Sequence, residues 1–315
     1  MDKTNNQIKN SKIIFSVTDL SSYDYCKRKF YLQKKLKLKE PLKPSMIIGT
    51  IKHSTFEEFN LKEKEIILKI KKEHTEEEIK KIILEKYYNT YKKTILKYKE
   101  QLYDFNISTE EVYEDKKIFL ADTILRTKII LENKKKGLIG EKLYKNMNPK
   151  IIAEQKIEEK EYSLKGIIDR IIEYKKEKNE ENKTKEKNRT KNNEEIKKTI
   201  TIYEFKSGKT PKTGVWSSHK TQIEAYLTLL SKQKNKNTII KEGIINYIDT
   251  NTERKIKYNP FMKIEILKKI DELKKTITKK EIPEKTTNKN KCISCGLKKY
   301  CYNKTYLKKL LEKTV

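Results

Sequence analysis

The chain has 315 residues, enough for one large domain or two small ones, and its 35% hydrophobic content suffices for a buried core. Its 75 lysine and arginine residues against 45 aspartate and glutamate residues give a formal net charge of +30. This balance indicates an anionic partner, and nucleic acid fits better than a membrane surface because lysine and arginine neutralise phosphates. Lys, Ile, Asn and Tyr are all plentiful, which also fits the codon bias of an AT-rich genome, so charge alone permits nucleic-acid binding without proving it.

The first ten residues are polar, and no apolar run approaches the length of a signal sequence or of a membrane span. We therefore expect a soluble, cytoplasmic protein with no membrane partner. Four cysteines in such a reducing compartment are metal ligands more often than disulfide partners.

Helical patterns fill the first part of the chain. Residues Ser16 to Leu38 combine capping residues with apolar residues at helical spacing, and Cys26 lies between two short helical pieces. A further helix is expected around Gly49, and it carries His53. A single histidine on an apolar helix face is more often packed than a ligand, so the spacing alone does not assign His53 a role.

Two capping boxes follow, Thr75–Glu78 and Ser108–Glu111. They predict helices from about Thr75 to Tyr103 and from about Thr109 to Lys135, each with an amphipathic stripe. We interpret this stretch as a helical insertion that packs over a sheet.

The pattern changes to strands from Ile151 onwards. Ile151–Ile157 and Tyr162–Tyr174 are rich in β-branched and aromatic residues and predict a hairpin. The charged run from Lys175 to Thr199 has too little apolar surface to offset the entropy of ordering, so it is expected to be a disordered loop.

An alternation of apolar, acidic, apolar and basic residues occupies Ile202–Lys206. In a strand, Glu204 and Lys206 share one face, and Asp169 at the end of a neighbouring strand brings a second carboxylate to them. Two carboxylates and an ammonium group suit metal-assisted phosphodiester hydrolysis, because hard oxygens bind Mg²⁺ or Mn²⁺. Taken alone, the acid-x-lysine pair is more typical of a solvated strand face.

A helix capped by Ser217 or Ser218 carries Gln222 and Tyr226 one turn apart, so both side chains can point at the same ligand. The remaining expected elements are a buried strand over Thr238–Thr250, a strand over Glu253–Tyr258 that pairs with it, and a helix from Phe261 to about Thr278.

Three cysteines, Cys292, Cys295 and Cys301, lie close together near the carboxy terminus, and Cys26 is the fourth thiol available. This arrangement predicts a metal site that ties the two ends of the chain together. The spacing suits zinc and an iron–sulfur cluster equally.

These residues, in this order, resemble the PD-(D/E)XK nuclease superfamily, and more narrowly its RecB-type iron–sulfur branch. That branch contains the CRISPR-associated four-cysteine exonucleases and the nuclease domains of AddB-type helicase–nucleases. The motifs that carry the resemblance are Cys26, Gly49-x-x-x-His53, Gly166-x-x-Asp169, Glu204-x-Lys206, Gln222-x-x-x-Tyr226 and Cys292-x-x-Cys295-x₅-Cys301. The resemblance implies an α/β fold with a restriction-endonuclease-like core, in which helices flank a central mixed sheet.

The resemblance also implies roles for the active-site residues. Asp169, Glu204 and His53 are expected to bind Mg²⁺ or Mn²⁺ together with the Phe205 carbonyl. Lys206 is expected to orient or activate the attacking water and to stabilise charge on the phosphate. Gln222 and Tyr226 are implied to position the DNA end and the active site. The first acid of the superfamily is not marked by a motif, and Glu154 and Glu57 are both candidates.

For the four cysteines the resemblance implies a structural 4Fe–4S cluster, with zinc as the alternative. Four regions are expected: an N-terminal segment with the first cluster cysteine (1–45), a helical region and insertion (46–145), a nuclease core (146–280, with the disordered loop at 175–199) and a C-terminal cysteine lobe closing on Cys26 (281–315).

The implied function is a metal-dependent DNA exonuclease that acts on single-stranded ends in CRISPR spacer acquisition, an antiviral defence, with integrase proteins as partners. One alternative is the nuclease subunit of an AddB-type recombination-repair helicase–nuclease complex. Another is a non-catalytic, zinc-stabilised DNA-binding module.

Overall fold

The computed structural model describes residues 13–176, 198–234 and 237–314. Six strands form one mixed sheet in the order β1-β3-β4-β5-β6, and β2 pairs with β3. The β1–β3 and β4–β5 pairs are parallel and the others are antiparallel. The strands are β1 (Phe15–Ser16), β2 (Lys150–Glu159), β3 (Leu164–Lys175), β4 (Lys198–Lys206), β5 (Thr238–Tyr247) and β6 (Thr252–Lys257). The predicted α/β class and the predicted β2–β3 hairpin are therefore confirmed.

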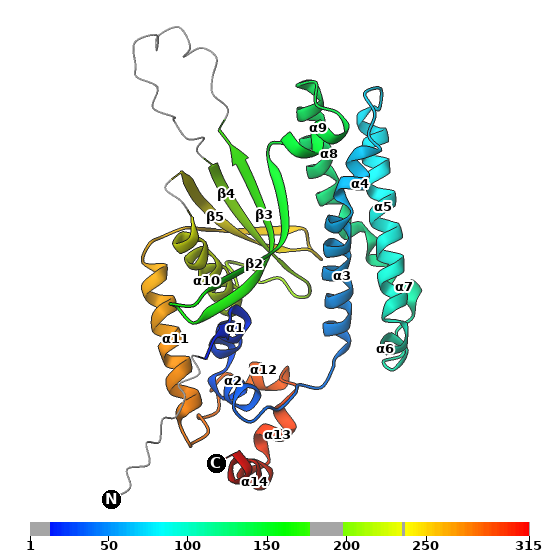
Figure 1. The fold of residues 1–315 in the computed structure, drawn as a ribbon. Helices are drawn as coiled ribbons and strands as arrows, with labels where there is room; N and C mark the ends of the chain where they lie inside the picture. The colour runs from blue at the N-terminus through cyan, green and yellow to red at the C-terminus, as the bar shows by residue number, and fades with distance from the viewer. Residues whose placement is uncertain (1–12, 177–197, 235–236, 315) are drawn as a thin grey trace, which may run out of the picture.

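Helices cover both faces of the sheet, each over its own hydrophobic core. One core contains α1 (Val17–Tyr25), α10 (Ser217–Gln233) and α11 (Met262–Thr278). The other is built by a helical layer that includes α3 (Pro44–Leu61), α4 (Glu63–Leu68), α5 (Glu76–Lys97), α8 (Leu120–Lys135) and α9 (Gly140–Asn146) (Figure 1). None of the described helices combines the length and apolarity that crossing a bilayer requires.

The predicted insertion is helical, but its two long helices are interrupted. Thr75 caps α5 through a capping box, yet that helix ends at Lys97 and is followed by the short α6 (Lys99–Tyr103). Ser108 caps α7 (Thr109–Glu114), after which Asp115–Phe119 forms a 3₁₀ turn before α8. That turn carries Phe119 into the core, where its ring packs on those of Tyr87 and Tyr91. Burial of this ring overrides the helical periodicity.

The helix that carries Gly49 and the charged run over 175–199 were also predicted from the sequence. The helix expected around Gly49 begins earlier, at Pro44, because a proline at the first helical position has no N–H to leave unsatisfied. The charged run expected to form a disordered loop over 175–199 lies outside the described residues, apart from its ends. Those ends belong to β3 and β4.

A smaller lobe joins the two ends of the chain. Here α2 (Lys27–Lys34) packs with α12 (Lys289–Ile293), α13 (Lys298–Tyr302) and α14 (Lys304–Thr314), below the sheet in Figure 1. Its apolar core includes Tyr31 and Leu32 from the amino-terminal part and Leu297 and Leu307 from the carboxy-terminal part.

A buried ionic network connects the helical layer to β3. Asp122 on α8 forms ion pairs with Arg126 and with Arg170 of β3, and it accepts a hydrogen bond from the Tyr87 hydroxyl. Burial opposes ionisation of Asp122, but Arg126 and Arg170 outweigh it and hold the pKa of this carboxyl well below its ordinary value. We call these four residues the Asp122 network.

Replacing Asp122 by alanine should destabilise the fold by about 3–5 kcal/mol, because the buried Arg170 guanidinium loses its ion-pair partner and Arg126 keeps only Glu63. Urea unfolding measures this. The matched control is Asp271→Ala, which removes an exposed carboxylate on α11 and should change the free energy of unfolding by less than about 0.5 kcal/mol. A loss below about 1 kcal/mol for Asp122→Ala would contradict the structural role given to the network.

Candidate active site

The candidate site lies where β4 separates from β3. The β3–β4 ladder ends at the pair formed by Arg170 and Tyr203, and β4 then continues to pair with β5 as far as Lys206. At its other end, β3 pairs with β1 only at residues 164 and 165. Asp169 sits in the opening between these two pairings, and its Oδ2 accepts a hydrogen bond of 2.7 Å from the Phe205 backbone N–H. The predicted meeting of the Asp169 and Glu204 strands is present.

Glu204 and Lys206 point to the same side of β4 and share a partner on α10. The Lys206 Nζ donates to Glu204 Oε1 at 2.7 Å and to Gln222 Oε1 at 2.8 Å, and Gln222 Nε2 donates to Glu204 Oε1 at 2.5 Å. The other oxygen, Glu204 Oε2, is buried and has no hydrogen-bond partner among the residues that the structure describes. A buried oxygen without a partner is costly, and a hard cation would satisfy it.

Burial governs the charges of both acids. Burial raises the pKa of Asp169. Burial and repulsion from the Asp169 carboxylate raise the pKa of Glu204. His53 on α3 has its Nδ1 3.9 Å from Asp169 Oδ2, and burial lowers the pKa of this imidazole. A neutral imidazole beside two carboxylates is a donor set that binds Mn²⁺ and tolerates Mg²⁺.

A further carboxyl, Glu154, lies across from Asp169. Its neighbours Ala153 and Gln155 pair with Arg170 and Ile168, so the register places Glu154 opposite Asp169. Its backbone has φ of 49°, the left-handed region that costs a non-glycine residue about 1–2 kcal/mol. Burial and Asp169 raise the pKa of Glu154 to about 7. Of the two candidates for the first acid, this geometry favours Glu154, since Glu57 is exposed on α3.

Gln222 and Tyr226 do fall on one face of α10, and both are buried. Burial, reinforced by Glu204, raises the pKa of Tyr226, so its hydroxyl stays protonated. A Cβ at Gly166 would lie 2.6 Å from the Tyr226 ring, so only glycine allows this ring to pack against β3. The burial favours a role in which these side chains hold Glu204 and β3 in place.

The acids open into a groove of about 680 Å³, which we call the active-site groove. It is lined by the β2–β3 hairpin, by the start of α1, where Ser16 pairs with Lys165 of the hairpin, and by α10. Its lining includes Ser16, Thr18, Lys156, Glu158, Lys165, Ile167, Asp169, Glu204, Lys206, Gln222 and Tyr226.

Residues 14–302 match the family model of the PD-(D/E)XK nuclease superfamily. The chain belongs to this superfamily. Its members are generally nucleases that act on DNA and use Mg²⁺ or Mn²⁺, so membership supports a metal-dependent nuclease. The search of curated proteins found no match to the chain.

The donors present are the residue types that the metal chemistry of the superfamily requires. Within the described residues, no three His, Cys, Asp or Glu side chains stand close enough together to hold a metal ion as they are placed. Lys206 and Gln222 engage one Glu204 oxygen, and the Phe205 N–H engages Asp169. The unpartnered Glu204 Oε2 remains the atom best suited to a cation.

Sequence reasoning did not single out one residue that lies near the candidate site, His219. It lies one turn before Gln222 on α10, and its Nδ1 is 3.3 Å from the Tyr247 hydroxyl. Burial and the nearby Lys206 charge lower the pKa of His219 to about 4, so the ring is neutral. The spacing to Gln222 was a usable signal, but only the tertiary fold brings His219 near Lys206.

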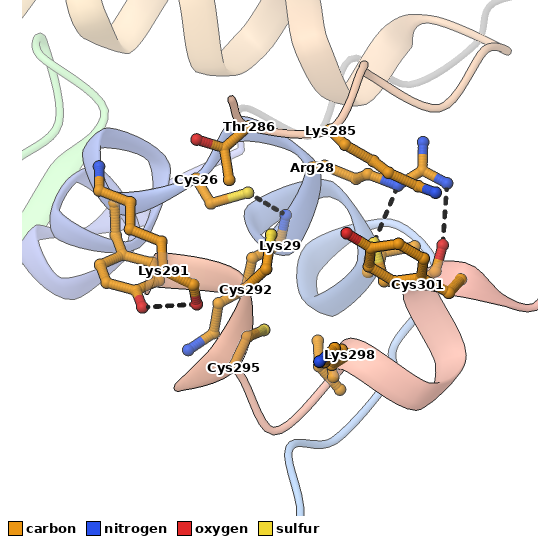
Figure 2. Close-up of a pocket in the computed structure, with 14 residues that line it drawn as sticks. Cys26, Arg28, Lys29, Lys285, Thr286, Lys291, Cys292, Cys295, Lys298 and Cys301 are labelled. Atoms are coloured by element: carbon orange, nitrogen blue, oxygen red, sulfur yellow. Dashed lines mark hydrogen bonds between the residues drawn. The ribbon is translucent and has the colours of Figure 1, made fainter. Parts of the chain in front are cut away.

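All four cysteines line one cavity between α2 and the α12–α13 segment, which we call the cysteine cavity (Figure 2). None is in a disulfide, and each is partly buried. The Lys29 backbone N–H donates to Cys26 Sγ at 3.4 Å, and the Arg28 Nε donates to Cys301 Sγ at 3.1 Å. The predicted approach of Cys26 to the three carboxy-terminal cysteines is thus observed, but as these described side chains are placed, no three of the sulfurs stand close enough together to hold a metal ion.

The raised pKa values of Asp169 and Glu204 predict how stability depends on pH. Unfolded carboxyls titrate near pH 4, so between about pH 4 and 7 the folded protein binds more protons than the unfolded chain. In EDTA, these groups should therefore lower the free energy of unfolding as the pH rises through that window. Mg²⁺ should restore stability mainly at the high-pH end, by about 2.7 kcal/mol at one hundred times its Kd.

Urea unfolding of the wild type and Asp169→Asn, at pH 5 and pH 8, measures the effect. The asparagine retains an acceptor for the Phe205 N–H but cannot ionise, so its stability should vary less with pH. Identical pH profiles for the two proteins would contradict the assigned pKa directions.

Proposed function

We propose that this protein is a metal-dependent DNA exonuclease that hydrolyses phosphodiester bonds at single-stranded ends. The observation that carries the proposal is the buried, unpartnered Glu204 Oε2, which stands beside Lys206 and Asp169 at the floor of an open groove. The formal net charge of +30 suits a polyanionic substrate.

The protein residues have separable roles in this reaction. His53, Asp169, Glu204 and the Phe205 carbonyl would hold Mg²⁺ or Mn²⁺, which would supply Lewis acidity and a water of lowered pKa. Lys206 places its ammonium where negative charge develops on the phosphate, because two hydrogen bonds to Glu204 and Gln222 fix its position.

Lys206→Ala and Asp169→Ala should each lower the cleavage rate by at least about a hundredfold, since each removes a charge on which the transition state depends. DNA binding should be largely retained. End-labelled single-stranded DNA with Mn²⁺ or with EDTA measures cleavage, and Lys241→Ala, an exposed lysine on β5, is the matched control.

A circular single strand of the same sequence tests the end requirement. An exonuclease shortens the linear DNA and leaves the circle intact. Cutting of the circle would refute the exonuclease assignment but retain the nuclease. Wild-type cleavage by the Lys206 variant would refute the active site, and tight binding without any cleavage would favour the DNA-binding module.

We also propose that Cys26, Cys292, Cys295 and Cys301 hold a 4Fe–4S cluster, with zinc as the alternative. Two of the sulfurs already accept hydrogen bonds, and such bonds stabilise the negative charge of a thiolate-bound cluster. The cavity is also lined by positive side chains, namely Arg28, Lys29, Lys285, Lys291 and Lys298. The expected region 281–315 and the α2 part of the expected region 1–45 would then form one metal-closed lobe, beside the helical region 46–145 and the nuclease core 146–280. In the expected region 1–45, β1 and α1 pack with the nuclease core.

Anaerobically purified protein should be brown and contain about four iron atoms and four sulfides per chain. Cys26→Ser should lose the iron while keeping the helix cap, because a serine hydroxyl can replace the Sγ that caps α2. Colourless wild-type protein with one equivalent of zinc would select the alternative.

For the pathway, we propose CRISPR spacer acquisition in the cytoplasm with integrase proteins as partners. The four-cysteine arrangement across both chain ends supports this choice, but it is shared with AddB-type helicase–nuclease subunits. Co-purification with an integrase or with a helicase from the native host decides between the two.

A further inference from the structure

We propose that the uncovered face of the β2–β3 hairpin is the track for a single DNA strand leading to the active site. In this track Ile167 packs against an unstacked base, while Lys156 and Lys165 bind neighbouring phosphates. The inference rests on the proposed nuclease function and names residues that its metal site does not require.

The strand register aligns these residues with the catalytic acid. Ile167 and Lys165 precede Asp169 by two and four residues on β3, which corresponds to about 7 and about 13 Å along the strand. Lys156 on β2 pairs directly with Ile167, and all three side chains line the active-site groove with Asp169. The groove therefore continues from the acids along the hairpin.

Ile167 is unusual for its position. It is 43% exposed in the wall of a groove whose floor holds buried acids, with an exposed lysine on the paired strand and another two residues away. One exposed isoleucine is ordinary on a protein surface. An apolar side chain with one lysine directly across from it and another two residues along its own strand, next to the acids, suits a strand that offers bases and phosphates side by side.

The same arrangement favours a single strand over a duplex. Base faces are stacked against each other in a duplex and are accessible only in an unpaired strand. The wall beside the hairpin is polar, because Ser16, which pairs with Lys165, and Thr18 present hydroxyls that lie 2.8 Å apart. Glu158 pairs with Lys165 and reduces the net charge of the hairpin face, so phosphate contacts there should be few.

The test measures binding of a short single-stranded DNA in EDTA by fluorescence anisotropy at several salt concentrations. Ile167→Ala should weaken binding about five- to tenfold through lost apolar contact, with an unchanged salt slope. Lys156→Ala with Lys165→Ala should reduce the slope of log Kd against log salt by about 1.4, since each single-strand phosphate contact contributes about 0.7. In Mn²⁺, KM should rise in both variants more than kcat falls.

Matched controls come from β5 and β6, away from the groove. Ile239→Ala removes another exposed isoleucine, and Lys255→Ala with Lys257→Ala removes another exposed lysine pair on one strand face. These controls should bind and cleave like the wild type.

Three outcomes are distinguishable. Metal-dependent cleavage by the wild type, with both hairpin variants equal to their controls, would overturn the track and leave the nuclease standing. Altered binding by the hairpin variants in a protein that never cleaves would retain the track and overturn the nuclease. If the double substitution at Lys156 and Lys165 weakened DNA binding no more than the control double substitution at Lys255 and Lys257, the attraction would be a non-specific effect of charge, and the track would be overturned.

Discussion

The buried contact between Asp122 and Arg170 is the constraint on which the active site depends. Arg170 immediately follows Asp169, and its guanidinium also lies 4.7 Å from the centre of the Phe205 ring. Phe205 in turn donates the backbone hydrogen bond that holds Asp169. The helical layer therefore contributes to the site, because Asp122 of α8 fixes Arg170, which follows Asp169 in the chain and contacts the ring of Phe205.

The site also sits where β2 and β3 change the face that they bury. On β2, Ile151 packs in the core under the helical layer, whereas Ile157, six residues later, packs in the other core. A regular strand would place both on one face. The left-handed Glu154 lies between them, opposite Asp169. Beyond this point the hairpin loses its helical cover on one face, which leaves Lys156 and Ile167 exposed beside the acids.

Sequence reasoning was sufficient where chemistry follows local spacing. Glu204 and Lys206 are two residues apart on one strand, and Gln222 and Tyr226 are one helical turn apart, so period alone groups them. It was insufficient where distant elements meet. Asp122 and Arg170 are 48 positions apart in different elements, and no periodicity in either segment predicts their pairing. The 3₁₀ break before α8 was missed for the same reason, since it serves the burial of Phe119.

Helix α1 links the two chemically active regions of the molecule. Its capping residue Ser16 lines the active-site groove, and its last cap, Cys26, lines the cysteine cavity. The nine residues of α1 span about 13 Å, so a single short helix connects the active-site groove to the cysteine cavity. A metal held by the thiols would fix the orientation of α1 and thereby the polar wall of the groove. The acids themselves are held by the Asp122 network and by Gln222, which do not involve the lobe. Loss of the metal should consequently disturb the placement of DNA before it disturbs the geometry of the acids.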